Sequence, residues 1–288
     1  QKIVTDHAPI EQLAEPLVRR LQVTVPAASL QRPDPDAVRF AEACGLTVPP
    51  ALLNTLHNQL QAQNGQLTVD YRIDTQDVLR FVEPSAPAIL GVAIDLGTTT
   101  LAAYLYDLTT GQRLAEASAL NPQKAYGADV ISRIEYALQD ETALKNLQAE
   151  LVGGINDLIA ELCAKPFTEQ DAQAAALDPE QLMLIALAGN TTMMHLLSGL
   201  NPAGLAKAPF VPVTLAGQTL PAAMLGIHIA SAGLALLLPS IASYVGADIT
   251  AGILACNLDR SKKKSTSLLL DIGTNGEIVL ASENGLVA

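Results

Sequence analysis

Tryptophan is absent from the 288-residue sequence, aromatic residues make up only 3% of it, and cysteine occurs three times. Cys44, Cys163 and Cys256 are far apart and form no CxxC pair, so neither a disulfide framework nor an iron–sulfur cluster within this chain is supported. No signal peptide opens the chain, because its first 15 residues are polar and carry charges of both signs. We therefore expect a cytoplasmic protein.

Positive charge is also scarce, since 17 Lys and Arg residues face 29 Asp and Glu residues for a net charge of −12. This balance argues against nucleic acid as a partner. Residues 208–247 contain no charged side chain at all, but four prolines interrupt them. A membrane-spanning helix needs about 20 apolar residues in a row. We therefore expect short buried strands and turns here, and no membrane partner.

Hydrophobic residues make up 49% of the sequence, and its length is sufficient for two domains. Residues 1–84 predict a small α+β domain, with strands at 21–25 and 66–73 and helices that begin near Asp36 and Pro50. A Pro-rich linker at 83–87 separates it from residues 85–288. No residue of the first domain suggests catalysis.

One short phrase occurs twice, as Asp95-Leu96-Gly97-Thr98-Thr99-Thr100 and as Asp271-Ile272-Gly273-Thr274-Asn275-Gly276. In both copies an apolar strand reaches an Asp, turns through Gly and small polar residues, and continues into a second strand, 101–106 or 277–281. The copies are 176 positions apart (271 minus 95). We infer two similar half-domains that face each other across a cleft.

The residue types of these turns suit phosphate and magnesium. Gly97, Gly273 and Gly276 have no Cβ, so the backbone can approach an anion and present successive N–H groups to it. Thr98, Thr99, Thr100, Thr274 and Asn275 add polar donors. Asp95 and Asp271 would repel phosphate, and holding Mg²⁺ is their sensible role. The alternative is ordinary hairpin turns, which Asp and Gly also favour; the repetition in one register argues against it.

Two further turns belong to the same prediction. Gly189, Asn190 and Thr191 follow a buried strand at 182–188 and precede a helix expected from Met193, an arrangement that favours anions unless Thr191 or Thr192 is a plain N-cap. The phrase Gly-Ala-Asp opens two helices, at Asp129 and Asp248. Asp248 could orient metal-bound water near the cleft, or be an N-cap only.

Several segments share the wording of one branch of the actin, sugar-kinase and heat-shock ATPase superfamily. They are residues 95–100, 121–123, 126–134, 189–193, 245–249 and 271–277. Over residues 85–288 the sequence resembles the ATP-dependent reductive activators of corrinoid proteins, and the first 84 residues look like that family's middle domain.

The resemblance implies an α/β fold of the actin-like ATPase (ribonuclease H-like) type, with mixed sheets, flanking helices and a preceding small α+β domain. It implies an ATPase whose conformational change returns a corrinoid protein from Co(II) to Co(I), with ATP and Mg²⁺ as cofactors. Asp95 and Asp271 would bind Mg²⁺, Asp248 would assist, and the Gly, Thr and Asn residues of the turns would bind phosphates. We also expect a homodimer; the electron donor is not specified.

The sequence departs from the family at both ends. The family's ferredoxin domain, with its two-iron two-sulfur cluster, has no counterpart, and the adenosine-binding segment expected after the second hairpin is missing. We therefore expect a fragment that is inactive alone. Two other functions stay open: a small-molecule (sugar or acyl) kinase, with Glu277 or Asp129 as base, and a non-catalytic dimerisation or partner-docking module.

Overall fold

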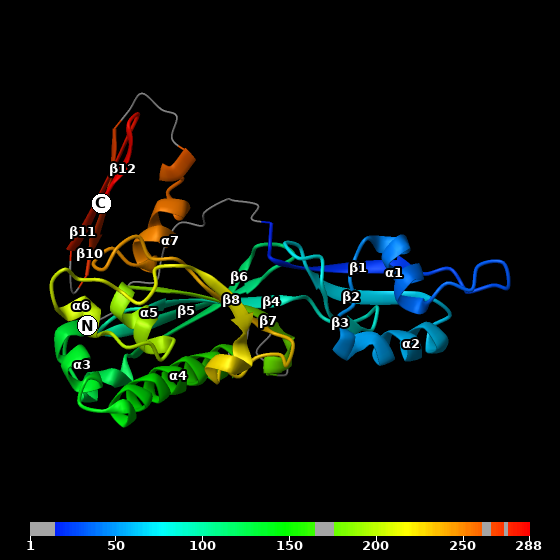
Figure 1. Cartoon of the computed structure of the whole chain (residues 1–288), viewed down its shortest axis with the longest axis horizontal. Coiled ribbons are helices and arrows are strands. Elements are labelled where there is room, and N and C mark those ends of the chain that lie inside the picture. The colour runs from blue at the N-terminus through cyan, green and yellow to red at the C-terminus, as the bar shows by residue number, and fades with distance from the viewer. Residues whose placement is uncertain (1–14, 165–175, 261–265, 274–275) are drawn as a thin grey trace.

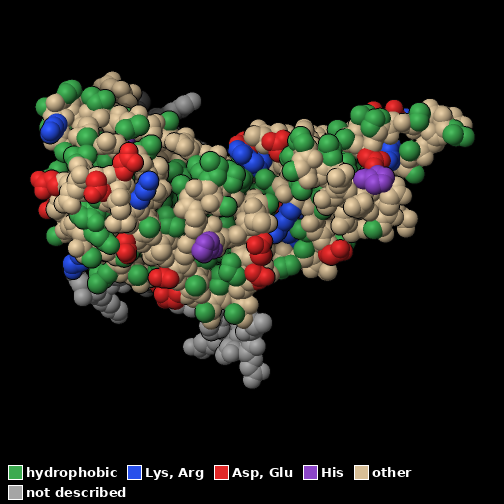
Figure 2. Space-filling model, turned by 60° about the horizontal axis from the view of Figure 1, so that its bottom comes forward, with side chains coloured by type: hydrophobic (Ala, Val, Ile, Leu, Met, Phe, Trp, Pro, Cys, Tyr) green, Lys and Arg blue, Asp and Glu red, His purple; other side chains and the backbone are tan. Residues whose placement is uncertain are grey.

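The protein is described by a computed structural model that places residues 15–164, 176–260, 266–273 and 276–288 (Figure 1). Two of the predicted site residues, Thr274 and Asn275, lie outside the described residues. Among the described residues, no helix is both long and apolar enough to cross a membrane. On the face in Figure 2, acidic side chains are spread over both the broad and the narrow part of the molecule.

The N-terminal part is a three-stranded antiparallel sheet covered by two helices at one end of the molecule (Figure 1). Its elements are β1 (Val18–Thr24), α1 (Asp36–Cys44), α2 (Leu53–Ala62), β2 (Gln66–Arg72) and β3 (Val78–Val82). Phe40 of α1, Leu56 of α2 and Val69 of β2 are fully buried in a core of its own. Helix α1 begins at Asp36, as the sequence predicts, directly after Pro35, and Gly45 ends it in the left-handed conformation at φ +74°.

The larger part is built on a six-stranded mixed sheet with strand order β6-β5-β4-β7-β9-β8. Its strands are β4 (Leu90–Leu96), β5 (Thr100–Asp107), β6 (Arg113–Leu120), β7 (Leu182–Gly189), β8 (Gln218–Pro221) and β9 (Leu234–Leu237). Strand β4 pairs antiparallel with β5 and parallel with β7, so it lies in the centre of the sheet. The sequence patterns predict β4, β5 and β7 but not β3 or β6. The short strands expected within residues 208–247 are present as β8 and β9, although the sequence does not give their bounds.

Alternation along the central strands decides which face of the sheet is covered. Ile94 and Leu96 of β4, and Leu101 and Leu105 of β5, are buried in one core. Helix α4 (Glu141–Ala164) covers this face with Leu147, Leu151, Ile155, Leu158 and Leu162 (Figure 1). The smaller helices α3 (Val130–Ala137), α5 (Thr191–Leu197) and α6 (Ala203–Ala206) lie on the same side of the molecule as one end of α4. Residues between the buried positions, Asp95 among them, therefore project to the opposite face.

A second sheet begins after α7 (Ala247–Ala255). It consists of β10 (Ser267–Ile272), β11 (Gly276–Ser282) and β12 (Gly285–Val287), and it stands apart from the first sheet in Figure 1. Val279 of β11 packs against Ile249 and Ile253 of α7. The strand–turn–strand phrase thus occurs once in each sheet, as the sequence analysis predicts.

The N-terminal part is tied to the larger sheet by a buried carboxylate. Asp70 of β2 lies between Arg20 of β1 and Arg80 of β3, and it receives hydrogen bonds from Arg20 Nε at 2.7 Å and Arg80 Nε at 2.8 Å. Arg20 also donates to the carbonyl oxygens of Ala86 and Pro87, and Arg80 to that of Glu180. The two arginines therefore link the small sheet to the beginning of the larger part.

We expect Asp70→Ala to destabilise the protein by about 3–5 kcal/mol, because it leaves two arginines without their shared counter-ion. Denaturant unfolding measures the change. The matched control is Asp74→Ala, since Asp74 pairs with Arg72 at the surface and should contribute less than about 1 kcal/mol. Equal effects of the two substitutions would contradict this account of the junction.

Candidate active site

Asp95 marks the end of β4, on the face of the sheet that α4 does not cover. Its neighbours Ile94 and Leu96 are buried, so the alternation of the strand directs the Asp95 carboxylate away from the core. Across the sheet it lies opposite Ala102 of β5 and Ala188 of β7, whose side chains are small. Asp95 therefore keeps access to water beside these small side chains, although the surrounding protein withdraws its carboxylate from water enough to affect its pKa.

Close backbone approach at two glycines brings the ends of β4 and β7 against the start of α7. A Cβ on Gly189 would lie 2.8 Å from Leu96 Cβ, and a Cβ on Gly246 would lie 2.4 Å from Asn190 Cα and 2.7 Å from the Gly189 carbonyl oxygen. Only glycine permits these approaches. Asp248, two residues after Gly246, is thereby placed in the first turn of α7 and next to the end of β4.

The second sheet adds Asp271 to the same place. Leu269 of β10 packs against α7, and Asp271, two residues further along the strand, projects from the same face. Glu277 of β11 lies directly opposite Asp271 in the register of the hairpin. Carboxylates from β4, α7, β10 and β11 thus face one region between the two sheets.

The pKa values of these carboxylates are raised, in part because the groups lie near one another. The pKa of Asp95 is raised to about 6, first by burial and then by the negative charges of Asp248 and Asp271. Burial also raises the pKa of Asp248, and the charge of Asp271 adds to the effect. Burial, Asp248 and Asp271 likewise raise the pKa of Glu277. Asp271 of the second repeated turn therefore lies near enough to act on Asp95 of the first, across the two sheets.

This donor set fits Mg²⁺ better than a fully protein-ligated metal. No cluster of three or more His, Cys, Asp or Glu side chains close enough to share a metal occurs within the described ranges. Mg²⁺ takes one or two carboxylates and keeps several waters, so separated carboxylates around an open space suit it. The three free cysteines, of which Cys163 is buried and Cys256 exposed, do not fit an iron–sulfur cluster.

The first turn is held from one side by its carbonyl groups. Asn121 Nδ2 donates to the Gly97 oxygen at 2.9 Å, Arg133 Nη2 donates to the Thr98 oxygen at 2.5 Å, and the Asn121 N–H donates to the Thr99 oxygen at 2.9 Å. Because a trans peptide directs its N–H opposite its C=O, the Thr98 and Thr99 N–H groups are directed away from Asn121 and Arg133. Both of those side chains are buried, so the N–H groups are directed outward, as in an anion-binding turn.

The Gly189 turn supports this arrangement from beside it. Asn190, and not Thr191 or Thr192, is the N-cap of α5, and its side-chain oxygen accepts a hydrogen bond from the Met193 N–H. Its Nδ2 donates to Thr98 Oγ1 at 3.0 Å, which joins the two turns. The helix accordingly begins at Thr191, two residues earlier than the sequence predicts, because Asn190 competes successfully for the cap.

The predicted site residues therefore divide into groups. Asp95, Asp248 and Asp271 face one another, and Gly97, Thr98, Thr99 and Thr100 form the turn beside them. Gly189 and Thr191 are buried and have internal roles, since Thr191 Oγ1 donates to the Ala242 oxygen. Gly273 and Gly276 flank the second turn, whose residues Thr274 and Asn275 lie outside the described part of the chain.

The Asp residues of the two Gly-Ala-Asp phrases have different structural roles. Asp129 is the N-cap of α3, in a capping box with Ser132, as the simpler interpretation expects. Asp248 is not a cap, because α7 begins one residue earlier with Gly246 at its N-cap. Only the second Asp is therefore directed at the cleft.

Residue-by-residue sequence reasoning did not assign the groups that hold the first turn. Asn121 is an N-cap whose Oδ1 accepts from Gln123 N–H, while Gln123 and Arg133 are fully buried polar residues. The signal was present in the segment 121–134, which follows the first hairpin and is rich in polar residues of fixed geometry. The sequence suggests Glu277 only as the base of a kinase, whereas the structure places it near Asp248 and Asp271.

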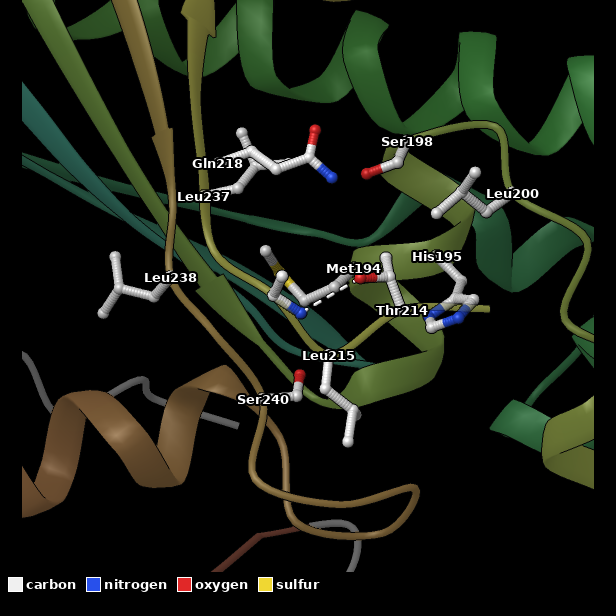
Figure 3. Close-up of a pocket in the computed structure, with 11 residues that line it drawn as sticks. Met194, His195, Ser198, Leu200, Thr214, Leu215, Gln218, Leu237, Leu238 and Ser240 are labelled. Atoms are coloured by element: carbon white, nitrogen blue, oxygen red, sulfur yellow. Dashed lines mark hydrogen bonds between the residues drawn. The ribbon is translucent and has the colours of Figure 1, made fainter. Parts of the chain in front are cut away.

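A small, partly open pocket near His195 is a separate feature (Figure 3). It is lined by Met194 and His195 of α5, Gln218 of β8 and Leu237 of β9, and it has room for about one water molecule. His195 Nδ1 contacts the Thr191 oxygen, and Nε2 accepts from the Val213 N–H. Both ring nitrogens are thus used within the protein, in keeping with a core histidine that has no chemical role.

Comparison with known proteins identifies the class to which the fold belongs. The chain matches a solved "Reductive activator for corrinoid,iron-sulfur protein" with a TM-score of 0.86 and 32% sequence identity, over 98% of this chain and 44% of that chain. The expected mixed α/β fold of the actin-like ATPase type is thereby confirmed.

The family model described as the RACo middle region matches residues 90–261, and the chain belongs to this family. It is also 36% identical over 199 residues to "Corrinoid activation enzyme RamQ" of Eubacterium limosum, across 67% of this chain and 30% of that relative. The chain therefore spans less than half the length of the relatives it matches. The resemblance to the reductive activators is confirmed.

The raised pKa of Asp95 has a consequence for stability in the absence of metal. Between about pH 4 and pH 6 the folded state keeps a proton that the unfolded chain has released, so this contribution is present at low pH and is lost as the pH rises through about 6. We expect Asp95→Asn to be more stable than the wild type at pH 7, by about 1 kcal/mol after allowance for partial exposure, and equal to it near pH 4.

Denaturant unfolding across pH 4–8 measures this difference, with Asp157→Asn on the exposed surface of α4 as the control. The control should follow the wild type at every pH. An Asp95→Asn curve that stays parallel to the wild type would contradict the raised pKa of Asp95 and with it the combined effect of burial and neighbouring carboxylates.

Proposed function

We propose that this chain is the nucleotide-binding part of an ATP-dependent reductive activator, which returns a corrinoid protein from Co(II) to the Co(I) state. The observation that supports this most strongly is that Asp95 and Asp271, from equivalent turns in separate sheets, influence one region between the sheets. A ligand held by both turns would join the sheets. Membership of the RACo family supplies the reaction class.

In this proposal Mg²⁺ is held by Asp95 and Asp271, with Asp248 orienting a metal-bound water. When bound, Mg²⁺ neutralises phosphate charge that the surrounding carboxylates would otherwise repel. The N–H groups of the Gly97–Thr100 turn and the equivalent groups near Gly273 and Gly276 bind the phosphate oxygens. Asn190 holds the first turn in place through Thr98.

The work done on the partner is conformational. If the closed form, with nucleotide bound by both turns, differs from the open form in its affinity for the corrinoid protein, ATP binding changes the equilibrium of that complex. The reduction itself transfers one electron to cobalt. The cysteines of this chain supply no carrier for it, so the electron comes from another group, and the two-iron two-sulfur domain of the family is our candidate.

The test uses the full-length protein and measures phosphate release with and without a cob(II)amide protein. We expect turnover that rises with the corrinoid partner and does not rise with sugars or acyl acids. A phosphorylated small molecule as product would instead indicate a kinase, and failure to bind MgATP would leave a docking module.

Asp95→Ala and Asp271→Ala are each expected to reduce Mg-dependent ATP hydrolysis to background, because each removes one of the two carboxylates proposed to hold the metal. Asp157→Ala, which removes an exposed carboxylate on α4, should retain the wild-type rate. Unchanged rates in either cleft variant, with the fold intact by circular dichroism, would refute the assignment of metal ligands.

A further inference from the structure

Arg133 of α3 is the largest fully buried side chain of the described residues, and its guanidinium has only neutral hydrogen-bond partners there. Nε donates to the Gly127 oxygen at 3.1 Å, Nη1 to Gln123 Oε1 at 3.2 Å and to Met193 Sδ at 3.4 Å, and Nη2 to the Thr98 oxygen at 2.5 Å. The charge of Asp129 acts on Arg133 through space, but no carboxylate is hydrogen-bonded to the guanidinium in the described part of the chain. A buried charge without a directly bound counter-ion is costly.

The location of this charge suggests what it does. One of its five N–H groups holds a carbonyl of the proposed phosphate turn, from the interior side. The other partners fix the guanidinium itself, since Gln123 is anchored in turn by a hydrogen bond to the Leu147 oxygen on α4 at 2.8 Å. The planar fork of arginine is suited to such simultaneous contacts, and lysine is not.

We propose that Arg133 is a positioning residue of the nucleotide site: it fixes the Thr98 carbonyl and thereby directs the Thr99 N–H toward the bound phosphates. This inference rests on the proposed function. Burial lowers the pKa of Arg133 to about 10, so the group stays protonated at neutral pH. Its positive charge behind the turn also offsets the repulsion between phosphates and the carboxylates of the cleft.

A purely structural role for Arg133 would have a different signature. A general loss of stability would weaken all ligands alike, because it lowers only the folded fraction. A positioning role acts on phosphate alone. The discriminating quantity is therefore the ratio of affinities for a non-hydrolysable MgATP analogue and for adenosine.

Calorimetry on the full-length protein measures both affinities for the wild type and Arg133→Lys. We expect the ratio to fall about tenfold in Arg133→Lys, which keeps the charge but cannot hold Thr98, Gly127 and Gln123 together. The matched control is Arg80→Lys. Arg80 also makes several hydrogen bonds, but it lies between the N-terminal sheet and the larger part, away from the proposed nucleotide site. Its ratio should equal that of the wild type.

A ratio in Arg133→Lys within twofold of the wild type overturns the positioning role while leaving the proposed function intact. A wild-type protein that binds neither the MgATP analogue nor adenosine overturns both. Should the variant fail to fold, NMR of wild-type protein labelled with ¹⁵N-arginine replaces it. The slowly exchanging guanidinium signal of the buried Arg133 should then shift with the MgATP analogue and not with adenosine; equal responses to both would overturn the inference.

Discussion

The site depends on one constraint: the fold holds several carboxylates near one another in a region partly withdrawn from water. Asp95, Asp248 and Asp271 come from β4, α7 and β10, and each is directed to one region by the packing of its own element. Such a region is stabilised by a cation, and phosphates can enter it only together with one. In the proposed activator, the carboxylates and the outward N–H groups of the first turn are complementary parts of one site for a metal–phosphate complex.

The same arrangement explains how binding could be converted into motion. The N-terminal sheet is linked to the larger part through Asp70, Arg20 and Arg80, whereas the second sheet packs mainly on α7. A ligand bound by one turn of the six-stranded sheet and one turn of the second sheet would change the position of the second sheet relative to the six-stranded sheet. In the proposed activator, this change of position transmits the effect of ATP binding to the corrinoid partner.

Much of this could be predicted from the sequence, because the decisive features are local. The repeated Asp-x-Gly-Thr phrase follows apolar strands, and both copies form strand–turn–strand units. Helix α1 has sharp chemical signals at Pro35 and Gly45, and its predicted start at Asp36 agrees with the structure. The resemblance to the reductive activators, read from short motifs, is confirmed.

The remaining features depend on tertiary contacts that no local pattern specifies. The short strands β8 and β9 are stabilised by their neighbours in the sheet, and their sequences have no distinct period. Asp129 and Asp248 occur in the same Gly-Ala-Asp phrase, but only Asp129 is an N-cap. Gly246 packs against Asn190 and is itself the N-cap of α7, so Asp248 lies within the first turn of that helix. The sequence shows the polar segment 121–134, but not that Thr98, Gln123 and Gly127 converge on the buried Arg133.

The central claim is that two turns from separate sheets bind one Mg–nucleotide. A crystal structure of the full-length protein with Mg²⁺ and a non-hydrolysable ATP analogue tests it most directly. We expect Asp95 and Asp271 both to contact the same Mg²⁺, directly or through a bound water. A metal bound by one turn alone, with the other Asp directed elsewhere, would contradict the account.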